Sequence, residues 1–153
     1  MVLSNLRVFD IGDWVGEELP RSLVSLKVRM CDRFNPEAWP PNLARLAVNE
    51  CDLFNPAIWP SELRTLEVYN CEDFDPVAWP VKLNRLNVLS EKTLDRVTWP
   101  VGLTKLEVGN WDCFNLRTWP PNLLTFTVRF CEQFSPVSWP TGLVGMLVDN
   151  CEI

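Results

Sequence analysis

One phrase repeats through this chain with a period of 20 residues, and that period constrains the fold more than any other feature. The phrase Leu-x-x-Leu-x-Val-x-x-Cys-x-x-Phe-Asn-Pro-x-x-Trp-Pro runs from Leu23 to Pro40 and recurs, with substitutions, along the chain. A fixed period near this length is typical of solenoids, in which each coil buries its apolar face only by stacking on its neighbours. The sequence therefore predicts a single stacked solenoid.

The leucine that begins each phrase sets the repeat boundaries. It recurs at Leu3, Leu23, Leu43, Leu63, Leu83, Leu103, Leu123 and Leu143. We expect one domain, 1–153, with no linker in it. Its seven full repeats would be 1–20, 21–40, 41–60, 61–80, 81–100, 101–120 and 121–140, followed by a partial repeat, 141–153.

Each repeat has a strand half and an irregular half. The segment Leu26-Lys27-Val28 alternates apolar and polar residues, which predicts a short strand with one buried face. Because every coil repeats it in the same direction, the strands should form one parallel sheet. Proline at positions such as Pro36 opposes a helix, so we expect turns, polyproline-like and 3₁₀ segments. An inward phenylalanine column would comprise Phe34, Phe54, Phe74, Phe114 and Phe134, beside a second column of tryptophans.

The strand half, Leu-x-x-Leu-x-Val-x-x-Cys, resembles leucine-rich repeats. The continuation Phe-Asn-Pro-x-x-Trp-Pro-x-x-Leu is most similar to FNIP-type, short 20-residue members of that group. This resemblance covers almost the whole chain, although the first repeat, with Trp14-Val15-Gly16, lacks Phe-Asn-Pro. It implies a right-handed curved solenoid with a parallel sheet on its concave face and little or no regular α-helix. It also implies that the concave face binds, and it carries no catalytic residues.

Composition argues against several classes of function. The formal net charge is -6 over 153 residues, which opposes binding to nucleic acid or to an anionic membrane. No apolar stretch is long enough for a spanning helix, and the first residues do not resemble a signal peptide. We therefore expect a cytoplasmic protein, with reduced thiols.

Five cysteines occupy one repeat position, and Cys113 is displaced from it by two residues. The five are Cys31, Cys51, Cys71, Cys131 and Cys151. Stacking them predicts a ladder of buried thiols, with disulfides or a metal site as alternatives. Because histidine is absent and thiols in line do not form a tetrahedron, we expect no metal and no cofactor.

The outward positions of the strands vary most between repeats and carry an excess of basic residues. If Leu26 and Val28 point inward, Lys27 and Arg29 point out from the concave sheet. Such positions hold seven basic side chains, Arg7, Lys27, Arg29, Arg45, Arg85, Lys105 and Arg129, against three acids, Glu67, Glu107 and Asp149. Arginine and tyrosine often supply binding energy at interfaces. The predicted partner-binding residues are Arg7, Lys27, Arg29, Arg45, Glu67, Tyr69 and Arg85.

One coil departs from the frame, because Glu91 replaces the cysteine and Trp111 takes the same position in the next coil. A buried unpaired carboxylate is unfavourable, so Glu91 should be paired, or this coil should form a kink or notch for a ligand.

These observations favour a non-catalytic scaffold that binds another protein, of acidic or mixed charge, through the concave sheet. A structural solenoid that self-associates through its C-terminal edge is the first alternative. Carbohydrate binding by exposed tryptophans is the second. An enzyme is not expected, since no nucleophile lies beside a plausible base in the repeat frame.

Overall fold

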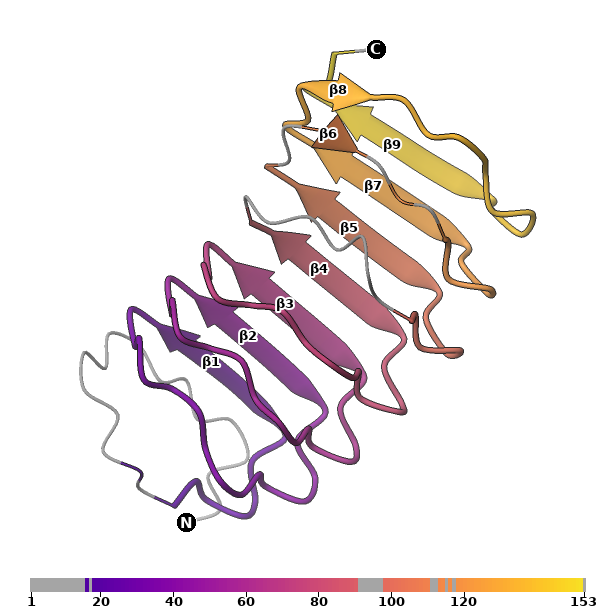
Figure 1. Ribbon diagram of the computed structural model, residues 1–153. Helices are drawn as coiled ribbons and strands as arrows, with labels where there is room; N and C mark the ends of the chain where they lie inside the picture. The colour runs from indigo at the N-terminus through magenta and orange to yellow at the C-terminus, as the bar shows by residue number, and fades with distance from the viewer. Residues whose placement is uncertain are drawn as a thin grey trace.

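The computed structural model describes residues 16, 18–90, 98–110, 113–114, 116 and 118–152, and these form a parallel-sheet solenoid (Figure 1). Arg7, Glu91 and Trp111, about which the sequence led to predictions, lie outside the described residues. No helix occurs in the described part of the chain. The strands are β1 (Ser25–Arg29), β2 (Arg45–Asn49), β3 (Thr65–Tyr69), β4 (Arg85–Leu89), β5 (Lys105–Gly109), β6 (Cys113–Phe114), β7 (Thr125–Arg129), β8 (Gln133–Phe134) and β9 (Gly145–Asp149).

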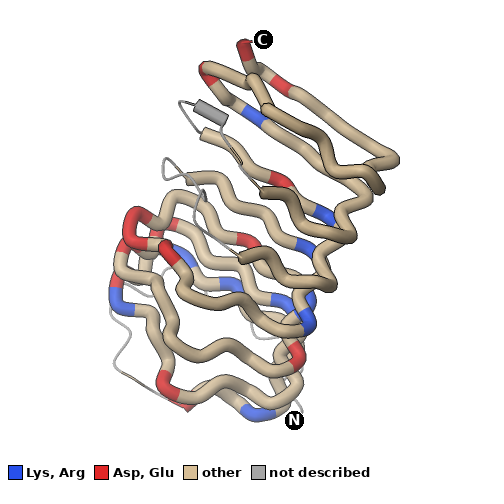
Figure 2. Tube along the Cα trace, turned by 45° about the vertical axis from the view of Figure 1, so that its right-hand side comes forward, with Lys and Arg blue, Asp and Glu red and all other residues tan. Residues whose placement is uncertain are grey.

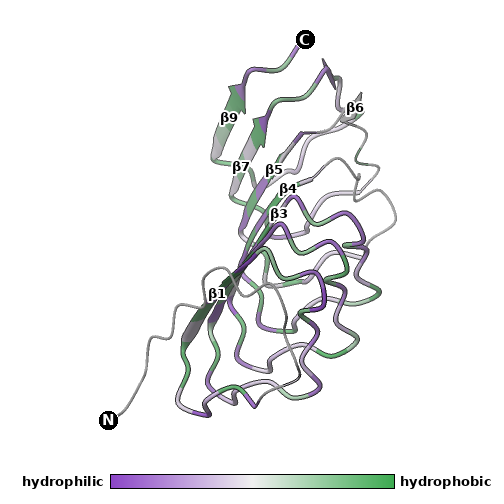
Figure 3. Ribbon diagram, turned by 90° about the vertical axis from the view of Figure 1, so that its left-hand side faces the viewer, coloured by the Kyte–Doolittle hydropathy of each residue, from purple (hydrophilic) through white to green (hydrophobic). Residues whose placement is uncertain are grey.

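Seven of these strands form one parallel sheet in the order β1-β2-β3-β4-β5-β7-β9. Each residue pairs with its equivalent in the next coil, so that Leu46 lies between Leu26 and Leu66. Figure 3 shows the sheet on one side and the turn segments on the other. On the turn side, β6 and β8 pair as a two-stranded parallel sheet, which the sequence analysis did not predict.

The strand pattern follows from alternation of side chains across a sheet. In β1, Leu26 and Val28 are buried, whereas Lys27 and Arg29 are exposed. The equivalent inward positions are buried on β2, β3, β4, β5 and β7. Much of the core is formed by these residues and by the leucines that begin the described phrases, Leu23, Leu43, Leu63, Leu83, Leu103 and Leu123. The core therefore lies between the sheet and the turn segments. The outward positions form the opposite side of the sheet, which we call the concave face.

Two turns bend each coil. Before each strand of the seven-stranded sheet, the leucine N–H donates to the carbonyl of a proline three residues earlier, as Leu23 does to Pro20 at 3.1 Å. After most strands, one residue adopts a left-handed backbone, and its N–H donates to the next strand. Asn suits this conformation better than most side chains, yet three of the six positions hold other residues. The six left-handed positions, with φ between 50° and 62°, are Met30, Glu50, Asn70, Asn110, Phe130 and Asn150.

Aromatic columns fill the turn side of the core. Phe34, Phe54 and Phe74 are buried and stack with ring centroids 6.0 Å apart, which confirms the predicted phenylalanine column for these coils. Phe134 is buried as well. Most indoles are also built into the fold, since the Trp39 Nε1–H donates to the Ile58 carbonyl at 2.7 Å. The same bond recurs at Trp59, Trp99 and Trp119.

Candidate functional site

Six of the seven predicted binding residues are described, and all six lie on the concave face. Lys27 and Arg29 are on β1, Arg45 on β2, Glu67 and Tyr69 on β3, and Arg85 on β4. In the sheet register, one outward row runs through Lys27 and Glu67, a second through Arg29 and Tyr69, and a third through Arg45 and Arg85. The structure therefore gathers these six residues on four adjacent strands.

The basic side chains of this face are largely unengaged. Among the described residues, no ion pair or side-chain hydrogen bond is made by Lys27, Arg29, Arg45, Arg85 or Lys105. All five are exposed. Figure 2 shows Lys and Arg positions on several neighbouring strands, with Asp and Glu positions gathered at turns of the coils. A set of exposed like charges without internal partners offers an attractive surface to an acidic group.

Tyr69 lies at the centre of a polar network on this face. Its hydroxyl donates to Glu67 Oε2 at 3.3 Å and accepts from Asn87 Nδ2 at 3.0 Å. Burial, together with the negative charges of Glu67 and Glu107, raises the pKa of Tyr69 to about 12.

Asn87 is not among the residues that the sequence analysis named, and its outward position on β4 would ordinarily leave it exposed. Its side chain is instead only 7% exposed. The register puts Asn87 directly between Glu67 on β3 and Glu107 on β5. Its Oδ1 atom is buried and has no hydrogen-bond partner. The signal was present in the 20-residue period, which aligns the three residues in one row.

The C-terminal part of the concave face neutralises its own charges. Arg129 donates from Nε to Glu107 Oε1 at 2.9 Å and from its terminal nitrogen to Asp149 Oδ2 at 2.8 Å. Both ion pairs are partly exposed. Beside them, Gly109 is buried. A larger residue would not fit there, because a Cβ would lie 2.5 Å from the Arg129 carbonyl oxygen and 2.8 Å from Leu89 Cδ2. Here the face is tightly packed, and its cation is committed to two carboxylates.

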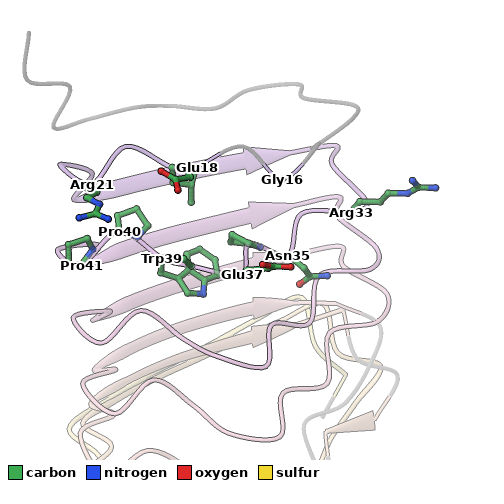
Figure 4. A pocket seen from close by; sticks show the side chains of 12 residues that line it. Gly16, Glu18, Arg21, Arg33, Asn35, Glu37, Trp39, Pro40 and Pro41 are labelled. Atoms are coloured by element: carbon green, nitrogen blue, oxygen red, sulfur yellow. The ribbon is translucent and has the colours of Figure 1, made fainter.

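A pocket of about 820 Å³ lies near the N-terminal end of the described coils, away from this network (Figure 4). Its walls include Trp39, whose Nε1–H donates to a backbone carbonyl. They also include Asn35, whose Nδ2 donates to the Leu53 carbonyl and whose Oδ1 accepts from the Asn55 N–H, both in the following coil. The charged side chains of the lining are two acids and two bases, Glu18, Glu37, Arg21 and Arg33. They do not form a single chemical centre, so this pocket is not the candidate site.

The cysteines are suited to packing rather than to chemistry. Cys31, Cys51, Cys71 and Cys131 are buried, and they remain thiols. Burial raises the pKa of Cys51 to about 11 and that of Cys71 to about 12. Both thiols are therefore protonated and poorly nucleophilic near neutral pH. Within the described residues, no group of three potential metal ligands occurs.

The exposed tryptophan row that carbohydrate binding would require is not formed in the described coils. Trp79 is buried, Trp39, Trp59, Trp99 and Trp119 are half-buried, and Trp139 is 48% exposed. The described part of the chain also contains no helix long and apolar enough to cross a bilayer.

Comparison with known proteins bears on the fold. No protein-family model and no curated protein sequence matches the chain. Among solved structures, YopM from Yersinia enterocolitica WA-314 matches with a TM-score of 0.53 and 18% sequence identity, over 89% of this chain and 35% of the YopM chain. The fold is leucine-rich-repeat-like. This chain spans about a third of the length of YopM, and at this identity the likeness shows the fold alone. The FNIP type stays a prediction.

Proposed function

We propose that this protein is a non-catalytic scaffold that binds another protein through the N-terminal part of its concave face. The observation that carries this proposal is the set of five exposed basic side chains on β1, β2, β4 and β5 that have no acidic partner among the described residues. Arg129, by contrast, is paired with Glu107 and Asp149 and is not available to a partner in the same way.

The charge of the face suggests the chemistry of the partner. An acidic segment would find Lys27, Arg29 and Arg45 on two adjacent strands, about 4.8 Å apart. The chain as a whole is acidic, so the attraction is confined to this face. Complementary charge of this kind directs a partner to one surface and sets its orientation. Tyr69 and the half-buried Leu89 supply the less polar contact that interfaces usually need at their centre.

Three features support a non-catalytic role. The cysteines with raised pKa are protonated near neutral pH, and histidine is absent from the chain. On the candidate face, the polar network of Glu67, Tyr69 and Asn87 holds no activated nucleophile.

Affinity capture from a cell extract tests this proposal with three forms of the chain. They are the intact chain, an Arg29→Glu, Arg45→Glu variant, and a control, Arg33→Glu with Arg64→Glu, that changes the net charge equally at exposed positions outside the concave face. We expect a partner that the intact chain and the control retain and the concave variant loses. Equal capture by all three forms would contradict the proposal.

Self-association is a second candidate, favoured by the state of β9. In the described residues β9 has one neighbour in the sheet, β7. Its core position Met146 is 51% exposed, whereas the equivalent Leu26, Leu46 and Leu66 are buried. A second copy of the chain could cover this end by adding a strand. Sedimentation velocity should then show a mass that rises with concentration for the intact chain and not for Met146→Glu. A constant monomer mass would exclude this candidate.

A further inference from the structure

We infer that the centre of the concave face binds an ammonium group, the side chain of a lysine on the partner protein, over Asn87 and between Glu67 and Glu107. This inference rests on the proposed function, because it names a group that the same face accepts. It adds an acidic centre to a face whose other charges are mostly basic.

The first observation is the buried amide of Asn87. The side chain is 7% exposed, and its Nδ2 donates to the Tyr69 hydroxyl at 3.0 Å. The amide oxygen, Oδ1, can accept a hydrogen bond, and it has no partner. A buried acceptor without a donor is unfavourable, so the free protein keeps a polar group that an N–H from outside would satisfy.

The second observation is the pair of carboxylates on either side. Glu67 and Glu107 are direct cross-strand neighbours of Asn87, each about one strand spacing away. Glu67 accepts a hydrogen bond from Tyr69 and has no ion pair in the described part of the chain. Glu107 is held in place by Arg129. The row therefore places Glu67, which has no ion pair among the described residues, and Glu107, which shares its charge with Arg129, on either side of one unsatisfied amide oxygen. A positively charged donor complements this arrangement.

An ammonium group matches this arrangement better than other cations. It is compact and has three N–H donors, which correspond to the Asn87 oxygen and the two carboxylates. A planar guanidinium would pair with one carboxylate through its fork and fit a recessed single oxygen less well. Calcium takes six to eight oxygen ligands, more than this row offers. Because Glu67, Tyr69 and Glu107 are all half-buried on the open side of the sheet, their side chains can rotate to admit the group.

The surroundings extend the description of the partner. Arg85 and Lys105 lie on the same two strands as Asn87 and Glu107, in the adjacent outward row, and both are unpaired in the described residues. Lys27, Arg29 and Arg45 lie further along the face, on β1 and β2. The matching segment of a partner is therefore a lysine flanked by acidic residues.

The ammonium site can be tested without the partner, using n-butylammonium as a probe of the lysine side chain and n-butanol as its uncharged control. Binding is followed on the full chain by the backbone amide resonances of residues 67, 87 and 107. We expect saturable shifts with n-butylammonium at roughly millimolar concentration, and none with n-butanol. Asn87→Leu should weaken binding at least tenfold, whereas Asn49→Leu, on the same face, should leave it unchanged. No saturable shift, or equal affinity in both variants, would overturn the inference.

Thermal stability gives a second and independent readout. Leucine has nearly the shape of asparagine, so Asn87→Leu removes the unsatisfied oxygen without opening a cavity, and the Tm of the free chain should rise by a few degrees. If Asn87 served only the fold through its bond to Tyr69, the same variant would lower the Tm. Failure of the probe would leave the capture result standing. If n-butylammonium binds the intact chain but the Arg29→Glu, Arg45→Glu variant still captures the partner, only the proposed function would be overturned.

Discussion

The first three strands of the sheet and the last two are built on the same repeat but differ in the burial of their inward residues and in the pairing of their outward charges. In β1 to β3 the core is closed, since Leu26, Leu46 and Leu66 are buried, while the basic side chains of the concave face have no partners in the described chain. In β7 and β9 the charges of the concave face are paired, because Arg129 bonds to Glu107 and Asp149, while the inward residue Met146 of β9 is half exposed. The difference separates positions that hold the fold from positions available to a partner.

Arg29 and Arg129 make this contrast within one row of the sheet. They occupy the same repeat position, but Arg29 is exposed and unpaired in the described residues, whereas Arg129 joins two carboxylates. A residue type at a fixed position therefore does not reveal its role. Its neighbours one strand away decide whether the charge stabilises the sheet or remains available.

The largest expected difference between the two regions is in the core. Leu66→Ala should lower the free energy of unfolding by about 3 to 4 kcal/mol, because it leaves a cavity in a closed core. Met146→Ala should lower it by less than about 1 kcal/mol, since that side chain is half in solvent. Urea unfolding of both variants measures these values. Equal losses would mean that β9 is covered in solution.

The buried thiols of the N-terminal coils should make stability depend on alkaline pH. Cys51 and Cys71 have pKa values raised to about 11 and 12 from an ordinary value of 9.0, so unfolding favours their ionisation. Their stabilising contribution is complete below pH 9 and is lost as pH rises through 11 to 12. Tyr69, raised to about 12 from 10.0, acts in the same direction.

Urea midpoints measured from pH 7 to pH 10.5 check this dependence. The midpoint should fall above pH 9 for the intact chain, and a Cys51→Ala, Cys71→Ala variant should show a smaller fall. An identical pH dependence in the two forms would show that these thiols do not control alkaline stability.

On the concave face, the two arginines should differ in their effect on stability. Arg129→Met should cost about 1 kcal/mol, a modest value because both of its ion pairs are partly exposed. The loss should be smaller at high salt, which screens such pairs. Arg29→Met should change stability by less than about 0.5 kcal/mol. Thermal unfolding at two salt concentrations compares them, and a larger loss at Arg29 would reverse the assignment of roles.

The smallest effect concerns the left-handed residue after each strand. Met30 and Phe130 adopt φ values of 53° and 52°, which cost more for their side chains than for asparagine. Met30→Asn and Phe130→Asn should each stabilise the chain by roughly 0.5 kcal/mol, and Asn70→Ala should destabilise it by a similar amount. Urea midpoints of the three variants provide the measurement. Destabilisation by Met30→Asn would show that packing of methionine outweighs backbone strain.

The architecture could be predicted from the sequence because a solenoid repeats one local pattern. The period placed the strands, and the alternation around Leu26 and Val28 identified the outward positions. The same reasoning does not single out Asn87, since an outward position is normally exposed, whereas this side chain is buried and hydrogen-bonded to Tyr69 on the neighbouring strand. The pairing of β6 with β8 was missed because two-residue strands leave no periodic signal.

The charges of the face illustrate the same limit. The sequence placed Arg129 with the other basic residues, although the register makes Asp149 its direct neighbour on the next strand. Reading pairs of outward residues 20 positions apart would have separated Arg129 from Arg29. Which acid an arginine selects, however, depends on side-chain reach across two strands, and this is seen in the structure.

The most direct test of the account compares Arg29→Glu with Arg129→Glu in their affinity for the partner captured by the intact chain. Calorimetric titration, corrected for the folded fraction, should show at least a tenfold loss for Arg29→Glu with unchanged stability. Arg129→Glu should lower stability and change the corrected affinity by less than threefold. If the two variants lose affinity equally, or if Arg29→Glu binds as tightly as the intact chain, the division between structural and available charges is wrong.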